Sequence, residues 1–427
     1  MRLLLLIPLL VFAGCRPASL MTSLERIDAH ALWPRFDVSA IPLATFDGEK
    51  TWLYRHPAPP PEFRRVRDGV FVREGRDPAI TANSTSTIGG VLTATLMPFV
   101  AASSPRERAG LVVHELFHAF QQKQHPDWSA NEADLFVYPL DDAQNLAAQQ
   151  LELEALRRAL RSSGDASACW AAEALQVRRE RFARLPPSSA AYERATEINE
   201  GLPTYVQPRA AGTPDAAVLP ADDFDAGAVR QRAYATGHAL ARLLDRFSPE
   251  WRERLEHGPL TPLDVLLSSA LETRRGTCGF TEEERADAQR RGDDGAAAIR
   301  ASREARRSEF LQRPGWRLVL EAKHEPLWPQ RFDPLNVQVV AAGEVLHTRH
   351  VKLGNAASQL EVLDVAALTV AAGEHPLFNG VRAVTISGLA EQPKVEERDG
   401  VTTIAAHGIT ARLKSADVSV RLTNEHR

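Results

Sequence analysis

Two histidines and a glutamate stand close together in the segment VVHELFHAFQQ, residues 112–122. His114 and His118 are four positions apart, and Glu115 follows the first of them directly. On an α-helix, positions i and i+4 lie on one face, so the two imidazoles can reach the same point. Two imidazole nitrogens one turn apart suit Zn²⁺, whose bonds to nitrogen are about 2.1 Å long. We therefore expect a zinc site with His114 and His118 as ligands, if this segment is helical.

The sequence predicts a helix from about Pro105 to Gln124. Ser104-Pro105-Arg106-Glu107 has the Ser-x-x-Glu pattern of a capping box, with proline at the first helical position. His125-Pro126 ends the pattern, because proline disfavours helix in the residue before it. Apolar residues recur at helical spacing in between, at Val112, Val113, Leu116, Phe117 and Phe120. On such a helix Glu115 can reach a water on the metal, which is the HExxH arrangement of zinc metallopeptidases.

A catalytic zinc site takes a third protein ligand and leaves one position to water. The extended pattern HExxHxxGxxH is not met, because positions 121 and 124 are both glutamine. The segment ERATEINEGLPTYV, residues 193–206, contains Asn199-Glu200-Gly201 followed by Tyr205. It resembles the Asn-Glu-Gly segment of the gluzincins, the thermolysin and aminopeptidase group of zinc peptidases. The resemblance implies that Glu200 is the third zinc ligand.

A second segment is similar to the same family. Residues 234–244 read YATGHALARLL and match the Tyr-x-x-Gly helix start that follows the third ligand in gluzincin aminopeptidases. The resemblance gives Tyr234 the role of stabilising the tetrahedral oxyanion, since a phenol can donate a hydrogen bond to the developing charge. Gly237 would permit close helix packing. The resemblance covers roughly residues 80–250 and is specific only at the motifs.

The chain between His118 and Glu200 is longer than in the aminopeptidases, so an insertion separates the two ligand helices. Within it, a strongly helical stretch carries Glu152, which remains an alternative third ligand. Glu197, one turn before Glu200, is interpreted as a partner that orients a histidine N–H. Pro203 predicts a kink just after Glu200. No motif for binding a free amino terminus precedes residue 114, so aminopeptidase specificity is not implied.

The segment STSTIGGVLTATL, which ends at Leu96, is rich in β-branched residues. In gluzincins an antiparallel edge strand beside the active helix pairs with the substrate backbone. Residues 87–92 are the candidate for that strand, which makes Thr87, Ile88, Gly89 and Gly90 the expected substrate-binding residues. The alternative is a buried strand that carries a glycine bulge.

We expect an α+β fold. Short strand-like runs within residues 32–100 predict a β-sheet portion, and residues 105–312 are mainly helical in pattern. After residue 313 the pattern changes to short strands separated by Gly, Asn and Asp turns, which predicts an all-β, sandwich-like domain. The expected organisation is a zincin-like metallopeptidase domain over residues 31–313 and a C-terminal domain over residues 314–427.

The N-terminal segment MRLLLLIPLLVFAGC is typical of a signal peptide, with Arg2 before an apolar run too short for a permanent span of about 20 residues. Ala13-Gly14-Cys15 resembles the end of a bacterial lipobox. The resemblance implies a lipid anchor on Cys15 that attaches the protein to a membrane of the cell envelope, with residues 16–30 as a tether. The alternative is an ordinary secretory signal that is cleaved nearby.

The net charge and the cysteine content limit the kinds of partner and bond that the sequence predicts. The net charge is −4 and basic segments are interspersed with acids, so nothing indicates nucleic acid. Cys169 and Cys278 are the only cysteines besides Cys15. In an exported chain they can form one disulfide, or they can remain two thiols.

These features predict a zinc-dependent peptidase of the cell envelope that acts on peptides or proteins. Glu115 would take a proton from the zinc-bound water, which attacks the peptide carbonyl, and pass it to the leaving amine. The same site could hydrolyse a non-peptide amide. A different alternative is a catalytically inactive zincin-like lipoprotein with a binding or structural role through its C-terminal β domain. Because Glu115 and both histidines are all present, the sequence favours the enzyme.

Overall fold

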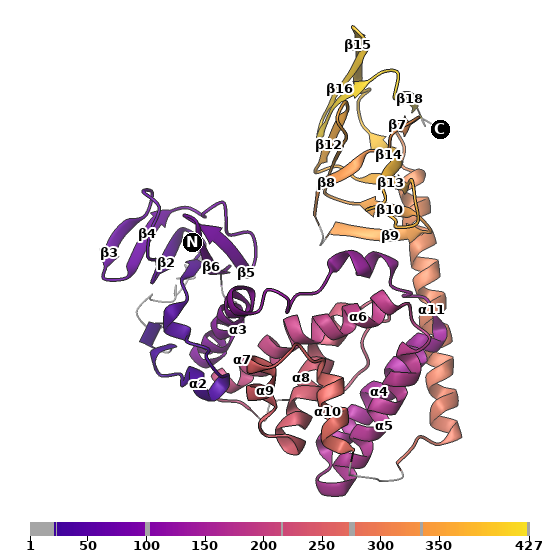
Figure 1. The fold of residues 1–427 in the computed structure, drawn as a ribbon. Helices are drawn as coiled ribbons and strands as arrows, with labels where there is room; N and C mark the ends of the chain where they lie inside the picture. The colour runs from indigo at the N-terminus through magenta and orange to yellow at the C-terminus, as the bar shows by residue number, and fades with distance from the viewer. Residues whose placement is uncertain are drawn as a thin grey trace, which may run out of the picture.

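The computed structural model describes residues 21–22, 24–98, 103–214, 217–272, 278–333 and 336–424. It has an N-terminal mixed sheet, a central helical region and a C-terminal portion of two antiparallel sheets, which confirms the predicted α+β class (Figure 1). None of the helices in the described ranges is both long and apolar enough to cross a membrane. Cys15 and the rest of the predicted signal peptide lie outside the described residues.

The N-terminal sheet has six strands in the order β3-β4-β2-β1-β6-β5. Only the β1–β6 pair is parallel, and β5 forms the edge of the sheet. The strand bounds are Leu43–Phe46, Lys50–Tyr54, Arg64–Arg67, Val70–Glu74, Ser84–Ile88 and Val91–Leu96 for β1 to β6.

The structure corrects the expectation of one continuous strand over residues 87–92. Gly89 and Gly90 form a two-residue turn between β5 and β6, with φ angles of 52° and 80°. Two successive positive φ angles are typical of the tight hairpin turns that glycine favours. A single strand with a bulge is therefore also excluded, and Thr87 and Ile88 alone belong to the edge strand.

The central region begins with α2 and α3, and its helices pack around the segments that carry His114, His118 and Glu200. Helix α3 has the predicted bounds and the predicted capping box between Ser104 and Glu107. The helices α2 to α11 span Ala29–Leu32, Pro105–Gln124, Ala143–Arg161, Gly164–Phe182, Pro187–Thr196, Leu202–Ala210, Val229–Phe247, Trp251–His257, Leu263–Leu271 and Glu282–Leu311. A π-helical turn, Glu197–Gly201, joins α6 to α7, and two 3₁₀ turns span Val38–Ala40 and Glu132–Val137.

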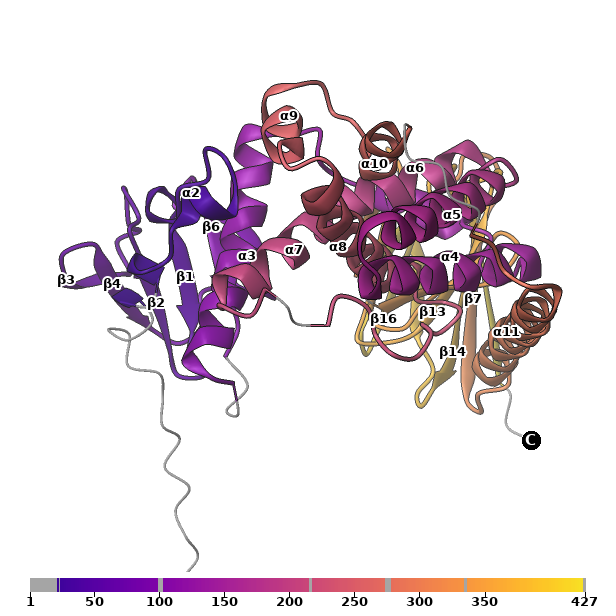
Figure 2. The ribbon, with the colours of Figure 1, turned by 90° about the horizontal axis from the view of Figure 1, so that it is seen from below.

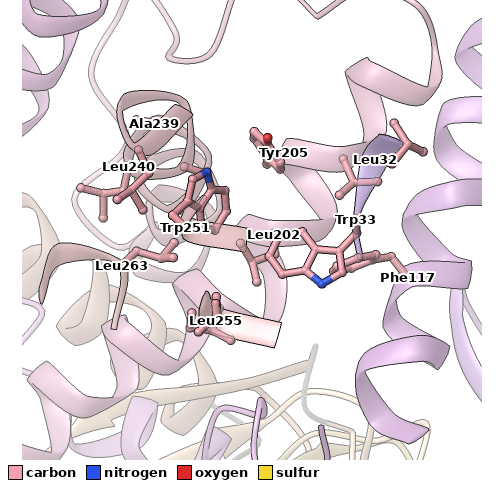
Figure 3. Packing of buried hydrophobic residues seen from close by; sticks show 14 of the residues in the cluster. Leu32, Trp33, Phe117, Leu202, Tyr205, Ala239, Leu240, Trp251, Leu255 and Leu263 are labelled. Atoms are coloured by element: carbon pink, nitrogen blue, oxygen red, sulfur yellow. The ribbon is translucent and has the colours of Figure 1, made fainter. Parts of the chain in front are cut away.

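A cluster of buried aromatic side chains packs α3 against neighbouring helices. Trp33 lies between Phe117 and Trp251, with ring centroids 5.4 Å away on each side and near-perpendicular planes. Edge-to-face pairs of this kind add to the stabilisation from apolar burial. Figure 3 shows these rings pointing toward one another beside Leu202 of α7. From below, α7 lies between α3 and α8 (Figure 2).

Helices α4 and α5 contribute to a disulfide and to a buried ion network. Cys169 of α5 is bonded to Cys278, which lies just before α11, with a Cα–Cα distance of 5.6 Å. The pairing that the sequence left open is therefore formed. Arg178 and Arg181 of α5 are completely buried among carboxylates from α4, α6 and the π turn.

The C-terminal portion is two six-stranded antiparallel sheets, β18-β7-β14-β13-β10-β9 and β15-β16-β17-β12-β11-β8. Buried side chains from both sheets, such as Leu318 and Leu353, share one apolar cluster, as in a sandwich. The strands β7 to β18 span Trp316–Ala322, Trp328–Phe332, Val337–Ala341, Glu344–His347, His350–Gly354, Gln359–Leu363, Ala367–Ala371, Val381–Leu389, Lys394–Arg398, Val401–Ala406, Ile409–Lys414 and Val418–Asn424.

Candidate metal centre

The two histidines of α3 face one point. Their Nε2 atoms are 3.2 Å apart, and their ring centroids are 4.9 Å apart. Two nitrogens held at about 2.1 Å from one ion in a tetrahedral site would be about 3.4 Å apart. The observed spacing is thus close to what a metal ion requires.

Glu200 comes to the same point from the π turn. Its Oε2 atom is 3.3 Å from Nε2 of His118, and the candidate ligand atoms of His114, His118 and Glu200 lie within 4.8 Å of one another. These three residues therefore form a group that can hold a metal ion. Two imidazoles and a carboxylate are the ligand types of many catalytic zinc sites.

The π turn has local causes that link it to α3. Pro203 has no N–H to bond the Asn199 carbonyl in a regular helix. The Ile198 carbonyl accepts a hydrogen bond from Nε2 of Gln121, at 2.9 Å, so that α3 and the ligand-bearing turn are joined directly. Thr204 Oγ1 donates to the Glu200 carbonyl at 2.7 Å. The irregular backbone is the π turn Glu197–Gly201, which contains Glu200, and α7 begins directly after it at Leu202; a kink just after Glu200 stays a prediction.

Burial sets the charge state of the group. Burial and the neighbouring His118 lower the pKa of His114 to about 3, so His114 is neutral and its ring can donate a lone pair to a metal. Burial alone would raise the pKa of Glu200, but hydrogen bonding to His118 and the charges of His118 and Arg230 lower it to about 2. The centre therefore offers a neutral His114 imidazole and an ionised Glu200 carboxylate, with the His118 ring beside them.

Glu115 is buried beside this group and is 5% exposed. Burial raises its pKa to about 7, in spite of the favourable charge of His118. A carboxylate with a pKa near neutrality is suited to exchange protons with a substrate or with water.

Arg230 and Tyr234 of α8 contact the third ligand. Arg230 Nη2 donates to Glu200 Oε1 at 2.7 Å, and its Nη1 donates to Glu132 Oε1 at 2.8 Å. Arg230 Nε donates to the Tyr234 hydroxyl at 3.1 Å, and that hydroxyl is also hydrogen-bonded to Glu200. The predicted oxyanion residue thus lies at the metal-ligand carboxylate. The sequence reasoning missed Arg230 and Glu132, although Arg230 precedes Tyr234 by one helical turn.

The competing carboxylates lie elsewhere. Both oxygens of Glu152 are bound by Arg178 and Arg181, at 2.6 Å to the nearest nitrogen of each. Glu197 is bound by Arg178 and by the hydroxyl of Thr236, so its interpretation as a histidine partner is wrong. The structure brings Glu200, rather than Glu152, to the histidines.

The expected substrate-binding residues lie at the sheet edge next to α3. Thr85 of β5 donates its hydroxyl to Gln122 of α3 at 2.8 Å. Ile88 is buried, and its carbonyl accepts a hydrogen bond from Nε2 of His56 at 2.9 Å. Thr87 is exposed, and Gly89 and Gly90 form the hairpin turn. Substrate binding by these four residues stays a prediction.

Gly237 allows α8 to approach the π turn closely. A Cβ atom at Gly237 would lie 2.7 Å from the Glu197 carbonyl oxygen and 2.9 Å from Gly201 Cα. We expect Gly237→Ala to separate α8 from the π turn, to lower the free energy of unfolding by about 1–3 kcal/mol, and to weaken metal binding through Glu200. Chemical denaturation and zinc titration measure the two effects. Gly227→Ala is the control, because its Cβ would meet no atom within 4 Å; equal behaviour of the two variants would contradict the prediction.

Arg230 holds one oxygen of Glu200 and leaves the other directed at His118. We expect Arg230→Met to weaken zinc binding by about 10–100-fold, as the loss of a group that orients a ligand does. Competition against a zinc-binding dye measures the change. Arg290→Met, at an exposed arginine of α11, is the control. Unchanged affinity in Arg230→Met would mean that the Glu200 carboxylate keeps its position without the arginine.

Comparisons with known proteins found no match for this chain. No protein-family model matches the chain, and no curated protein or solved structure matches it. The interpretation of the centre therefore rests on the residues of this chain: the spacing of the two histidines, the position of Glu200, and the buried Glu115 beside them.

Proposed function

We propose that the protein is a zinc-dependent peptidase of the cell envelope. The observation that carries the proposal is the convergence of His114, His118 and Glu200 on one point, with the buried Glu115 next to them. The same residues form the HExxH and Asn-Glu-Gly motifs of the gluzincins, which are peptidases. A buried carboxylate beside the three ligands is placed to exchange a proton with a bound water, a role that a purely structural zinc site lacks.

His114, His118 and Glu200 would hold the zinc ion. When bound, zinc supplies Lewis acidity, which polarises a carbonyl group and makes water more acidic. Glu115 accepts a proton from the attacking water and returns it to the leaving nitrogen of the cleaved peptide. Tyr234 is positioned by Arg230, and its phenolic hydrogen, which bonds Glu200 in the structure, would turn to the charge that develops on the carbonyl oxygen.

The proposed cell-envelope location has two supports. The first is the lipobox-like end of the N-terminal segment at Cys15. The second is the Cys169–Cys278 disulfide, since such bonds persist mainly in oxidising compartments. A lipid on Cys15 would attach the protein to the membrane and keep a peptidase away from cytosolic proteins.

Metal content and hydrolysis test the proposal together. The full chain, purified without chelator or metal-affinity resin, should contain about one zinc per chain by mass spectrometry. It should cleave a quenched fluorescent peptide library, lose that activity with a zinc chelator, and regain it when zinc is restored. A protein that neither contains nor takes up zinc, or that binds zinc without cleaving any peptide in the library, would contradict the proposal.

A further inference from the structure

A large cavity lies between the helical region and the C-terminal sheets. Its volume is about 890 Å³, which is within the range of small-molecule sites. Apolar side chains from four parts of the chain line it: Phe136 after α3, Leu153 of α4, Ile299 of α11, and Phe332 and Val339 of the C-terminal sheets. His114, His118 and Glu200 do not line it, so it is separate from the metal centre.

Contacts between distant segments form part of the cavity wall. The ring of Phe136 is 6.0 Å from that of Phe332 and 5.9 Å from that of Phe378. His375 Nε2 donates to the Ala133 carbonyl at 3.0 Å, which joins the 3₁₀ turn Glu132–Val137 to the sheets. These contacts connect the helical and the β parts of the cavity wall.

Arg232 of α8 lines the same cavity and is only 4% exposed. Its Nη2 donates to Glu193 Oε2 at 2.7 Å. Its Nε and Nη1 are buried and have no hydrogen-bond partner in the described part of the chain. An arginine stays charged, and buried donors without an acceptor are costly.

The Glu193 carboxylate, which Arg232 contacts, also accepts hydrogen bonds from other residues. Glu193 also accepts hydrogen bonds from Arg181, at 2.6 and 2.8 Å, and from the Tyr138 hydroxyl at 2.6 Å. Arg181 is bound by Glu152 as well, whereas the Nε and Nη1 donors of Arg232 have no acceptor among the described residues, so Arg232 can take a second one. A charged acceptor would bind more strongly than a neutral one.

We propose that this cavity binds an aliphatic chain with a terminal carboxylate, such as a fatty acid, with its carboxylate directed at Arg232. Apolar side chains supply much of the wall and favour an aliphatic chain, and polar residues that also line the cavity, such as Gln149 and Arg303, can contact a polar end group. The ligand would also lie near the metal centre, since Glu132 lines the cavity and is joined through Arg230 to Glu200. This inference does not depend on the proposed peptidase activity.

Equilibrium dialysis of the full chain with radiolabelled dodecanoate tests the proposal. Two neighbouring alanines of α11 provide matched variants, because both are exposed and only Ala298 lines the cavity. We expect saturable binding of one dodecanoate per chain, a loss of at least about tenfold in affinity in Ala298→Trp, and little change in Ala297→Trp. Dodecanol should bind at least about tenfold more weakly than dodecanoate, because it lacks the charge.

Three results would overturn the proposal. They are the absence of saturable dodecanoate binding, equal binding by Ala298→Trp and the unaltered chain, and equal binding of dodecanol and dodecanoate. The first two exclude the cavity as the site, and the third excludes the carboxylate as the recognised group. Because binding rather than hydrolysis is measured, none of these results bears on the peptidase proposal.

Discussion

Glu115→Gln is expected to remove peptide hydrolysis while the protein still binds one zinc ion. Glutamine has the size of glutamate and can fill the same buried position, but it cannot accept a proton. General base catalysis by a positioned side chain contributes about 10²–10⁴-fold, and we expect a loss of at least that order in the rate. Zinc binding should persist, because His114, His118 and Glu200 supply the ligands without Glu115.

The measurement pairs the rate of cleavage of a quenched fluorescent peptide with zinc content by mass spectrometry. Glu107→Gln is the matched control on the same helix, since glutamine also serves at that position of a capping box. Loss of zinc in Glu115→Gln would assign Glu115 a structural role. An unchanged rate, with zinc bound, would mean that another group acts as the base.

Local sequence signals were sufficient for the helix that carries the histidines. Its start was predicted from Ser104 and Glu107 and its end from Pro126, and the structure has the same bounds. Capping and proline effects act within a few residues, so they can be seen in a short stretch of sequence. The glycine pair at 89–90 was an equally local signal for a hairpin turn, and giving more weight to that signal would have divided the strand correctly.

The surroundings of Glu200 could not be predicted in the same way. Arg230 contacts both Glu200 and Glu132, which lie in different parts of the chain, and no periodicity connects them. The misinterpretation of Glu197 has the same origin. Its position one turn before Glu200 suggested a role at the metal, but Arg178 of α5 binds it instead. Contacts between distant segments are decided by packing, which one sequence does not display.

The two candidate third ligands should respond to truncation in opposite ways. Loss of a group that only orients a ligand weakens metal binding by about 10–100-fold. Glu200→Ala is expected to weaken zinc binding by more than about 100-fold, because it removes the ligand itself. Its effect on the free energy of unfolding without metal should be smaller than that of Glu152→Ala, because Arg230, one of its partners, is partly exposed, whereas both partners of Glu152 are buried.

Glu152→Ala is expected to leave the intrinsic zinc affinity of the folded protein unchanged and to lower its stability. Arg178 and Arg181 each keep a second carboxylate, Glu197 and Glu193 respectively. The completely buried cluster would nevertheless lose one of its negative charges and leave arginine donors unpaired. Removing one partner of a buried ion pair costs about 3–5 kcal/mol of unfolding free energy.

Zinc titration and urea denaturation, applied to both variants, separate the two effects. Each variant is the control for the other, because both remove one glutamate from the same helical region. If Glu152→Ala lost zinc while Glu200→Ala kept it, the third ligand would be Glu152. That outcome would require both Arg178 and Arg181 to release the carboxylate, since they bind its two oxygens in the structure. The energetic cost of freeing a carboxylate from two buried arginines is the physical reason to expect Glu200 instead.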